Sequence, residues 1–374
     1  MLIKKLIYSF FHKRLMAIPP DQSQQQKYFC SLCLLFIIQY IIMNNIYLSI
    51  VIPTHNSQNT VEPLLSSIYN SPSVNFNKLE VIVVDDESSD NTVKILKDLS
   101  KKFKIKILVL KKNVGPAKAR NLGVKKTKGK YLLFLDGDVE LKNQTLANVF
   151  KIISNNKVKA FTGIWDYHQK TNNFFPQFKA LRDWSYWFAE REKNSHYYLF
   201  STRVAGIEKK LFQKLNGFAE IYEELEDIEL TYRIEKQSSI KFCANIMVNH
   251  EFENFLPIAI KYFKRSRDWV KLYLKRLRFD PVATSKREAI ISILSSVLIF
   301  FLLMSVLFKL LIIPSIILFL IFSYLELTFW KLILHKKGVL FLLQSIPTSI
   351  ILYLIINLGA AWGYFLSTKS NREL

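Results

Sequence analysis

The sequence predicts an α/β domain with a Rossmann-like, mostly parallel sheet, followed by a helical region that lies in a membrane. Strand-like and helix-like segments alternate from Ile46 onward, a pattern that favours parallel strands joined by crossover helices. Three of the strands end in polar clusters, at the edge where open α/β sheets bind ligands. From Ala289 onward Leu, Ile, Phe and Val dominate, with long gaps between charges. Such composition indicates membrane-spanning helices.

The elements of the α/β domain follow from hydrophobic periodicity. In one predicted helix, Leu64, Leu65 and Ile68 share a face. The run 132–135 has no polar interruption, as expected of a strand that is covered on both faces. The predicted strands are 48–52, 79–84, 105–110 and 131–135, and the predicted helices are 59–69, 92–103 and one that begins within 113–123.

Composition divides the chain into four parts. Residues 1–45 are a basic and apolar extension, 46–254 the α/β domain, 255–287 a basic amphipathic helix, and 288–374 a membrane region of about three helices. The predicted spans are 289–308, 310–330 and 338–366, each long enough for a bilayer that needs roughly 20 residues.

The N-terminal extension contains the apolar run 28–43, which is short for a membrane span. If it did cross, the basic residues before it would stay inside the cell and the rest of the chain would be exported. Two interpretations stay open: a segment that lies on the membrane surface, or a translation start at Met43.

The formal net charge of +22 points to an anionic partner. Residues 261–287, beside the first predicted span, hold ten Lys or Arg against two Asp. Basic residues in this position favour anionic membrane lipid as the partner, with no nucleic acid. The three cysteines form no disulfide framework, and the pair Cys30 and Cys33 is interpreted as packing within an apolar run.

Asp136 and Asp138 follow directly after the buried strand 131–135. Gly137 between them has no side chain, so a phosphate or metal can approach the backbone. Mg²⁺ and Mn²⁺ prefer oxygen ligands and usually share them with substrate phosphates. These residues alone leave two readings open, a divalent metal site and a solvated acidic turn.

Five motifs occur in order along the chain: Ser49-Ile-Val-Ile-Pro-Thr-His-Asn56, Val81-Ile-Val-Val-Asp-Asp-Glu-Ser-Ser-Asp90, Asp136-Gly-Asp138, Gly217-Phe218 and Glu226-Asp-Ile-Glu-Leu230. Together they resemble family 2 glycosyltransferases of the GT-A fold. The resemblance covers residues 46–253 and implies transfer of a sugar from a nucleotide-sugar donor, with inversion at the anomeric carbon.

The resemblance implies a donor side and a divalent metal, Mn²⁺ or Mg²⁺. Asp86 would accept a hydrogen bond from the nucleobase, Asp85 would shape its loop, and Arg120 would meet base or phosphate unless its role is structural. The residues implied for nucleotide-sugar binding are Pro53, Thr54, Asn56, Asp85, Asp86, Arg120, Asn121 and Asp136. The residues implied for the metal are Asp138, Asp136 and His250.

On the acceptor side, Asp227 is the expected catalytic base, with Glu226 as its substitute, because a carboxylate near the anomeric centre can remove the acceptor proton. Gly206 is expected close to the acceptor. Trp184 and Trp187 lie in an aromatic stretch that fits a sugar-stacking platform, a membrane-interface belt or a plain core.

The sequence thus predicts a membrane-anchored, metal-dependent hexosyltransferase whose catalytic domain is cytoplasmic. It would add one sugar to a hydroxyl of a lipid-linked or membrane-proximal glycan acceptor. The stretch Arg265-Ser-Arg-Asp-Trp269 lacks the Gln-x-x-Arg-Trp motif of processive family members, which argues against a polymerising synthase. Two alternatives remain: transfer directly onto a polyprenyl phosphate, and a membrane scaffold that binds nucleotide without turnover.

Overall fold

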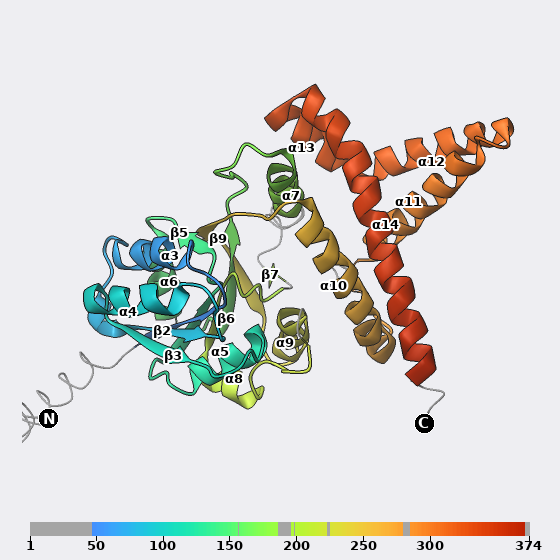
Figure 1. Cartoon of the computed structure of the whole chain (residues 1–374). Helices are drawn as coiled ribbons and strands as arrows, with labels where there is room; N and C mark the ends of the chain where they lie inside the picture. The colour runs from blue at the N-terminus through green and yellow to red at the C-terminus, as the bar shows by residue number, and fades with distance from the viewer. Residues whose placement is uncertain are drawn as a thin grey trace, which may run out of the picture.

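The computed structural model describes residues 47–155, 157–185, 196–197, 199–222, 225–279 and 285–370. An α/β domain is followed by α10, which stands between that domain and a group of long C-terminal helices (Figure 1). The predicted extension 1–45 and the predicted acceptor residue Trp187 lie outside the described residues. The expected order of an α/β domain followed by apolar helices is confirmed.

The α/β domain holds one nine-stranded sheet. Its strands are β1 (Leu48–Thr54), β2 (Leu79–Asp85), β3 (Ile105–Val109), β4 (Tyr131–Leu135), β5 (Val139–Leu141), β6 (Ala160–Trp165), β7 (His196–Tyr197), β8 (Val204–Glu208) and β9 (Ile240–His250). Its helices are α3 (Val61–Tyr69), α4 (Thr92–Lys102), α5 (Pro116–Val124), α6 (Thr145–Ser154), α7 (Phe174–Trp184), α8 (Lys209–Lys214) and α9 (Glu226–Glu235).

The strands are arranged in the order β3-β2-β1-β4-β8-β6-β9-β5, with β7 also paired to β9. The four strands predicted from the sequence are mutually parallel. The later part is mixed, because β8 runs antiparallel to both β4 and β6 while β6 and β9 are parallel. The sheet is therefore parallel where the sequence alternates between strand and helix, and mixed beyond β4.

The central strands are buried on both faces. Alternate residues of a strand point to opposite faces, so Ile50 and Ile52 pack with Leu64 of α3 in one cluster, whereas Val51 packs with Ala117 of α5 in the other. All seven residues of β2 and all five of β4 are buried. Burial on both faces explains why these strands are mostly apolar rather than alternating between apolar and polar residues.

The strand β5 brings residues far apart in sequence together at one edge. It follows β4 after the turn at Asp136–Asp138 and pairs antiparallel with the end of β9, placing Val139 opposite His250. Asp138 therefore lies beside His250, although 112 positions separate them. The polar ends of β1, β2 and β4 meet at the same edge.

The helical region consists of α10 (Phe255–Arg276), α11 (Lys286–Met304), α12 (Ile312–Leu325), α13 (Leu327–Lys337) and α14 (Val339–Ser370). Among the described residues, two helices are long and apolar enough to cross a membrane, Lys286–Met304 and Val339–Thr368. The segments Lys309–Leu325 and Leu327–Lys337 would supply a third span only as a broken one.

The second predicted span, 310–330, is not one straight helix. Its two helices meet at 71° around Glu326. The carboxylate of Glu326 is buried and accepts a hydrogen bond of 2.8 Å from the hydroxyl of Tyr353. Lys337, at the end of α13, donates to Gln177 of α7 at 2.5 Å. The bend thus returns α13 toward the α/β domain, which a hydropathy pattern does not reveal.

The long helix α14 packs along α10 through two glycines. A Cβ on Gly359 would lie 2.4 Å from the carbonyl oxygen of Phe263, and one on Gly363 would lie 2.2 Å from that of Arg267. Any larger residue would separate the helices, so the glycines permit the close approach. This contact attaches the apolar helices to the amphipathic helix that borders the α/β domain (Figure 1).

Candidate active site

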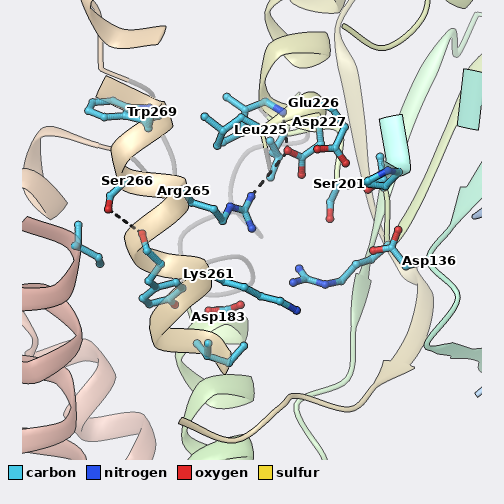
Figure 2. Close-up of a pocket in the computed structure, with 18 of the residues that line it drawn as sticks. Asp136, Asp183, Ser201, Leu225, Glu226, Asp227, Lys261, Arg265, Ser266 and Trp269 are labelled. Atoms are coloured by element: carbon cyan, nitrogen blue, oxygen red, sulfur yellow. Dashed lines mark hydrogen bonds and ion pairs between the residues drawn. The ribbon is translucent and has the colours of Figure 1, made fainter. Parts of the chain in front are cut away.

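A cavity of about 1620 Å³ connects the polar edge of the sheet with the helical region. One wall comes from the ends of β1, β2, β4 and β9 and from the start of α9, and the opposite wall from α10. In Figure 2, Lys261 and Arg265 point from α10 toward the carboxylates Asp136, Glu226 and Asp227. The cavity continues between α10, α11 and α14.

Asp86, at the end of β2, organises the loop that leads into α5. Its two carboxylate oxygens accept hydrogen bonds from the backbone N–H groups of Val114 (2.8 Å) and Gly115 (2.9 Å). Its carbonyl lies 2.7 Å from Nδ1 of His55. All four residues line the cavity. Asp86 therefore holds two loops together at the position expected for a nucleobase.

The neighbouring Asp85 shapes the loop after β2 and does not line the cavity. It is fully buried and accepts hydrogen bonds from Ser88 Oγ (2.6 Å) and from the backbone N–H of Ser88 (3.1 Å). Asn56 has a positive φ of 50° and accepts from the N–H of Ser89 at 2.9 Å. Pro53, Thr54 and Asn56 all line the cavity. The turn after β1 is thus hydrogen-bonded to the turn after β2.

Arg120 of α5 joins the two groups of carboxylates. Its Nη2 lies 2.5 Å from Asp136, and its Nη1 lies 2.8 Å from Glu226. Burial lowers the pKa of the guanidinium, but the two carboxylates more than offset this and raise it. The guanidinium also lies 5.7 Å from the ring centre of Phe218. With both terminal nitrogens engaged, Arg120 fits the structural role that the sequence left open beside phosphate contact.

Glu226 and Asp227 open α9 at the side of the cavity. Burial raises the pKa of Glu226 to about 7, with Asp227 adding to the effect and Arg120 opposing it. Asp227 lies 3.9 Å from Nη2 of Arg265, which comes from α10 (Figure 2). Adjacent carboxylates in different environments are a common arrangement for acid–base work. Of the two, Asp227 is the one that faces α10 rather than the buried arginine.

Asp138 and His250 form the second polar pair of the sheet wall. Oδ2 of Asp138 lies 3.4 Å from Nε2 of His250. Burial would raise the pKa of Asp138, but the imidazole and Arg203 lower it to about 2. The other imidazole nitrogen, Nδ1, is buried and has no hydrogen-bond partner within the described part of the chain. The pair holds a carboxylate and an imidazole in one place at the cavity surface.

Across the described ranges, no group of three or more His, Cys, Asp or Glu is arranged to hold a metal by itself. Asp138 and His250 supply two donors of suitable chemistry, and Asp136 lies two residues away with one oxygen on Arg120. Mg²⁺ is usually bound by one or two carboxylates together with substrate phosphates rather than by a complete protein cage. The donor set therefore fits a divalent ion that is completed by a diphosphate.

Besides Asp85, three described site residues predicted from the sequence lie away from the cavity. Asn121 binds the turn after α8, donating to the carbonyl of Phe218 at 2.9 Å and accepting from its N–H at 3.0 Å. A Cβ on Gly206 would lie 2.2 Å from the ring of Phe161, so this glycine serves packing inside the sheet. Trp184 packs against Tyr167 and the main core, which corresponds to the plain-core reading.

Sequence reasoning missed the cations of the cavity. Arg203, Lys261 and Arg265 all line it. Arg203 lies over the ring of Trp165 at 4.6 Å, and Lys261 pairs with Glu253 at 2.5 Å. The available signal was the one-turn spacing of Lys261 and Arg265, which puts both on one face of the helix. The sequence prediction attributed that basic charge to lipid contact alone.

Residues 49–215 match the profile of glycosyl transferase family 2. This match includes the ends of β1, β2 and β4 that form the sheet wall of the cavity. The chain carries a glycosyl transferase family 2 domain. The resemblance read from the first three motifs is thereby confirmed.

Several curated proteins are similar to part of this chain. A poly(ribitol-phosphate) beta-N-acetylglucosaminyltransferase, TarS of Staphylococcus aureus, is 35% identical over 108 residues, covering 28% of this chain and 18% of TarS. A glycosyltransferase of uncharacterised role from Haemophilus influenzae is 27% identical over 201 residues, covering 51% of this chain and 63% of that protein. The chain thus spans less than a fifth of TarS and less than two thirds of the second relative.

Among solved structures, the mannosyltransferase PcManGT of Pyrobaculum calidifontis, crystallised with GDP-Man and Mn²⁺, has a TM-score of 0.49 with 16% identity. The alignment covers 87% of this chain and 86% of PcManGT. The family 2 domain of this chain rests on the profile match over residues 49–215.

Proposed function

We propose that this protein is a membrane-anchored, inverting glycosyltransferase that moves one hexose from a nucleotide-sugar to a hydroxyl of a lipid-linked or membrane-proximal glycan. The observation that carries the proposal is the shared cavity. It is lined by the Asp86 loop, by the pair Asp138 and His250, and by the pair Glu226 and Asp227. The proposed nucleotide site, diphosphate site and base would thus adjoin one another at a sheet whose first part, residues 49–215, matches the family 2 profile.

The donor would be held from the nucleobase to the diphosphate along the sheet edge. Asp86, Pro53 and Thr54 line the part of the cavity proposed for the nucleoside. Asp138 and His250 would hold Mn²⁺ or Mg²⁺, with Asp136 nearby. When bound, the ion would neutralise charge that develops on the departing nucleoside diphosphate. Arg120 keeps Asp136 and Glu226 in fixed positions through the two ion pairs.

Asp227 is the proposed general base. The acceptor hydroxyl loses its proton to a carboxylate oxygen of Asp227 while its oxygen forms the new bond to the anomeric carbon. The bond from that carbon to the diphosphate breaks on the opposite side, which inverts the configuration. The base is better assigned to Asp227 than to Glu226, because Glu226 is paired with the buried Arg120 at 2.8 Å, whereas Asp227 faces α10 across the cavity.

Two other functions make different demands on these residues. Transfer onto a polyprenyl phosphate needs no base, because that acceptor is already ionised near neutral pH. A scaffold that only binds nucleotide needs neither Asp227 nor a path for the acceptor. The continuation of the cavity between α10, α11 and α14 favours an enzyme that receives a second substrate from the membrane side.

A screen of nucleotide-sugars tests the proposed activity. The detergent-purified full chain is incubated with each donor and Mn²⁺, and release of nucleoside diphosphate is measured with and without membrane extract. We expect one donor to be consumed faster with extract, and consumption to stop in EDTA. No turnover of any donor with Mn²⁺ or Mg²⁺ in the presence of extract would reject the enzyme in favour of the scaffold.

We further propose that the protein is integral to the cell membrane with its catalytic domain in the cytoplasm. Two apolar helices support anchoring, and the basic residues of α10 and the end of α13 support this orientation. A cysteine placed at Asn143, in an otherwise cysteine-free chain, should resist an impermeant thiol reagent in intact cells and react after permeabilisation. Equal labelling of intact cells would reverse the orientation.

A further inference from the structure

One arginine in the wall of the cavity has no acceptor for its guanidinium. Arg203 directly precedes β8, whose first residue, Val204, pairs with Leu135 at the end of β4. Arg203 therefore lies at the edge of the sheet where Asp136 and Asp138 follow β4, and it lines the cavity. Within the described residues its guanidinium makes no hydrogen bond and no ion pair.

The other arginines that line the cavity differ from Arg203 in this respect. Arg120, Arg182 and Arg265 each have a hydrogen-bond or ion-pair partner on the protein. A guanidinium carries several N–H donors and no acceptor, and a partly buried one is stabilised when an oxyanion accepts from it. The N–H groups of Arg203 are therefore available to a ligand in the cavity.

Two aromatic rings orient the guanidinium of Arg203. It lies over the ring of Trp165, at 4.6 Å from the ring centre, and over that of Phe252 at 5.6 Å. Both rings are buried. Contact with an aromatic ring favours the cation electrostatically and leaves the N–H groups able to make a planar, bidentate contact with an oxyanion. Arg203 is thus positioned before any ligand binds.

The ring of Phe252 also connects Arg203 with the pair Asp138 and His250. It packs edge-to-face on the imidazole of His250, with ring centres 4.5 Å apart. Burial would raise the pKa of Asp138, but the charges of His250 and then Arg203 lower it, so the guanidinium lies within electrostatic reach of the carboxylate. No ion pair joins Arg203 and Asp138, both of which are described and line the cavity. The position of Arg203 suits an anion that is bound at Asp138 and His250.

We propose that Arg203 binds the distal phosphate of the nucleoside diphosphate, the phosphate that carries the sugar in the donor. This inference rests on the proposed function and adds a catalytic residue to the same site. The guanidinium donates bidentate hydrogen bonds to oxygens of that phosphate. When the bond between the anomeric carbon and the phosphate oxygen breaks, its electron pair stays on the oxygen, and Arg203 offsets the added negative charge.

The affinities of diphosphates and monophosphates for the full chain in detergent test this contact. UDP, GDP, UMP and GMP are titrated calorimetrically into wild type and Arg203→Met with Mn²⁺. For the base that wild type binds, Arg203→Met should weaken the diphosphate by about tenfold or more and the monophosphate by about twofold or less, because only the diphosphate has a distal phosphate. Equal losses for the two ligands would overturn the proposal, since they would show that Arg203 only supports the fold of the site.

Two further variants separate the phosphate contact from packing. Arg203→Lys keeps the charge but loses the bidentate contact, so its affinity for the diphosphate should lie between those of Arg203→Met and wild type. Arg276→Met is the matched control, because Arg276 also lies over an aromatic ring, 3.1 Å from the ring centre of Tyr232, but does not line the cavity. It should leave the affinity for the diphosphate unchanged. A loss as large in Arg276→Met as in Arg203→Met would contradict the proposal.

Removal of the metal ion separates Arg203 from the proposed metal ligands. In EDTA, Arg203→Met should still bind the diphosphate more weakly than wild type, because the guanidinium contacts the phosphate directly. In the same buffer, Asp138→Asn should cause no further loss. An effect of Arg203→Met that disappears in EDTA would overturn the direct contact.

The same titrations distinguish failure of this inference from failure of the proposed function. If wild type binds neither diphosphate with Mn²⁺, both fail. If Arg203→Met binds the diphosphate as tightly as wild type does, the inference alone fails. That outcome together with a loss of sugar transfer would assign Arg203 to the acceptor instead, and the proposed glycosyltransferase would stand.

Discussion

The two walls of the cavity are built in different ways. The sheet wall consists of strand ends and their turns, where Asp85 and Asp86 are buried and bonded to neighbouring loops. The α10 wall is one amphipathic helix, whose cavity-side cations Lys261 and Arg265 are partly exposed. The sheet wall is preorganised, as a site for charge stabilisation in a transition state must be. The α10 wall is the one that faces the proposed acceptor.

This difference predicts that changes to the sheet wall impair chemistry or stability, whereas changes to α10 impair acceptor binding. Because α10 also packs on α14 through Gly359 and Gly363, the helix on the proposed acceptor side is in direct contact with an apolar helix that could cross the membrane. Asp227 belongs to the sheet wall and faces Arg265 of α10. The strongest test of the difference between the two walls is therefore made at this residue.

Asp227→Asn should reduce transfer by roughly 10²–10⁴-fold, because it keeps the shape of the side chain and removes the proposed base. Donor affinity should change little, since the residue lies on the acceptor side. Transfer is assayed on membranes, and donor binding by titration of the nucleoside diphosphate with Mn²⁺. The matched control is Glu229→Gln on the same helix. Transfer at a near wild-type rate would move the polyprenyl-phosphate acceptor mechanism ahead of the hydroxyl one.

Arg120→Met should destabilise the α/β domain by about 3–5 kcal/mol, because it removes the shared partner of two carboxylates, one of them buried. Thermal unfolding of the detergent-solubilised chain measures the loss. Adding Glu226→Gln should recover part of it, since the buried carboxylate is then neutral. Lys101→Met, which removes an exposed ion pair with Asp98, is the control and should cost about 1 kcal/mol or less. If Arg120→Met destabilises the chain as little as Lys101→Met does, Arg120 does not stabilise the sheet wall.

The buried Glu226 makes stability depend on pH. Its pKa is raised from 4.5 to about 7 in the folded chain, so the folded state binds a proton that the unfolded state releases. The contribution is fully present below pH 4.5 and is lost as the pH rises through about 7. In wild type, the loss of this contribution should lower the midpoint of thermal unfolding as the pH rises from 4.5 to about 7. Glu226→Gln should reduce this dependence of the midpoint on pH. The exposed Glu235→Gln on the same helix should leave the slope as it is; a slope unchanged in Glu226→Gln would contradict the assignment.

The sheet wall could be predicted from the sequence more fully than the α10 wall. Strands β1 to β4 were predictable because each is largely apolar and is bounded by polar turns, and their ends converge by the rules of parallel sheets. Asp138 and His250 could be assigned to one metal site only through the family resemblance, because the β5–β9 pairing that brings them together joins segments distant in sequence. Gly206 and Trp184 were placed on the acceptor side from motif position and composition, which do not say which face of an element is buried.

The helix wall and the bent span were not predictable in the same way. The basic residues of α10 were recognised, but which of them face the cavity depends on how α14 packs against the helix. Glu326 interrupts the apolar run 310–330 as a single charge in a hydropathy pattern. Its hydrogen bond with Tyr353, 27 positions away, accompanies the bend of 71°. Both features depend on contacts between segments distant in sequence.

The most direct test of the account is metal-dependent binding of the nucleoside diphosphate to the sheet wall. The full chain in detergent is titrated calorimetrically with UDP and with GDP, in Mn²⁺ and then in EDTA, for wild type and for Asp138→Asn. The account predicts that one of the two diphosphates binds wild type in Mn²⁺, and that EDTA or Asp138→Asn each weakens it by about 10²-fold or more, because the charged ligand of the ion is lost. If the diphosphate binds in EDTA, and binds Asp138→Asn, as tightly as it binds wild type in Mn²⁺, the metal-dependent site at Asp138 and His250 is contradicted.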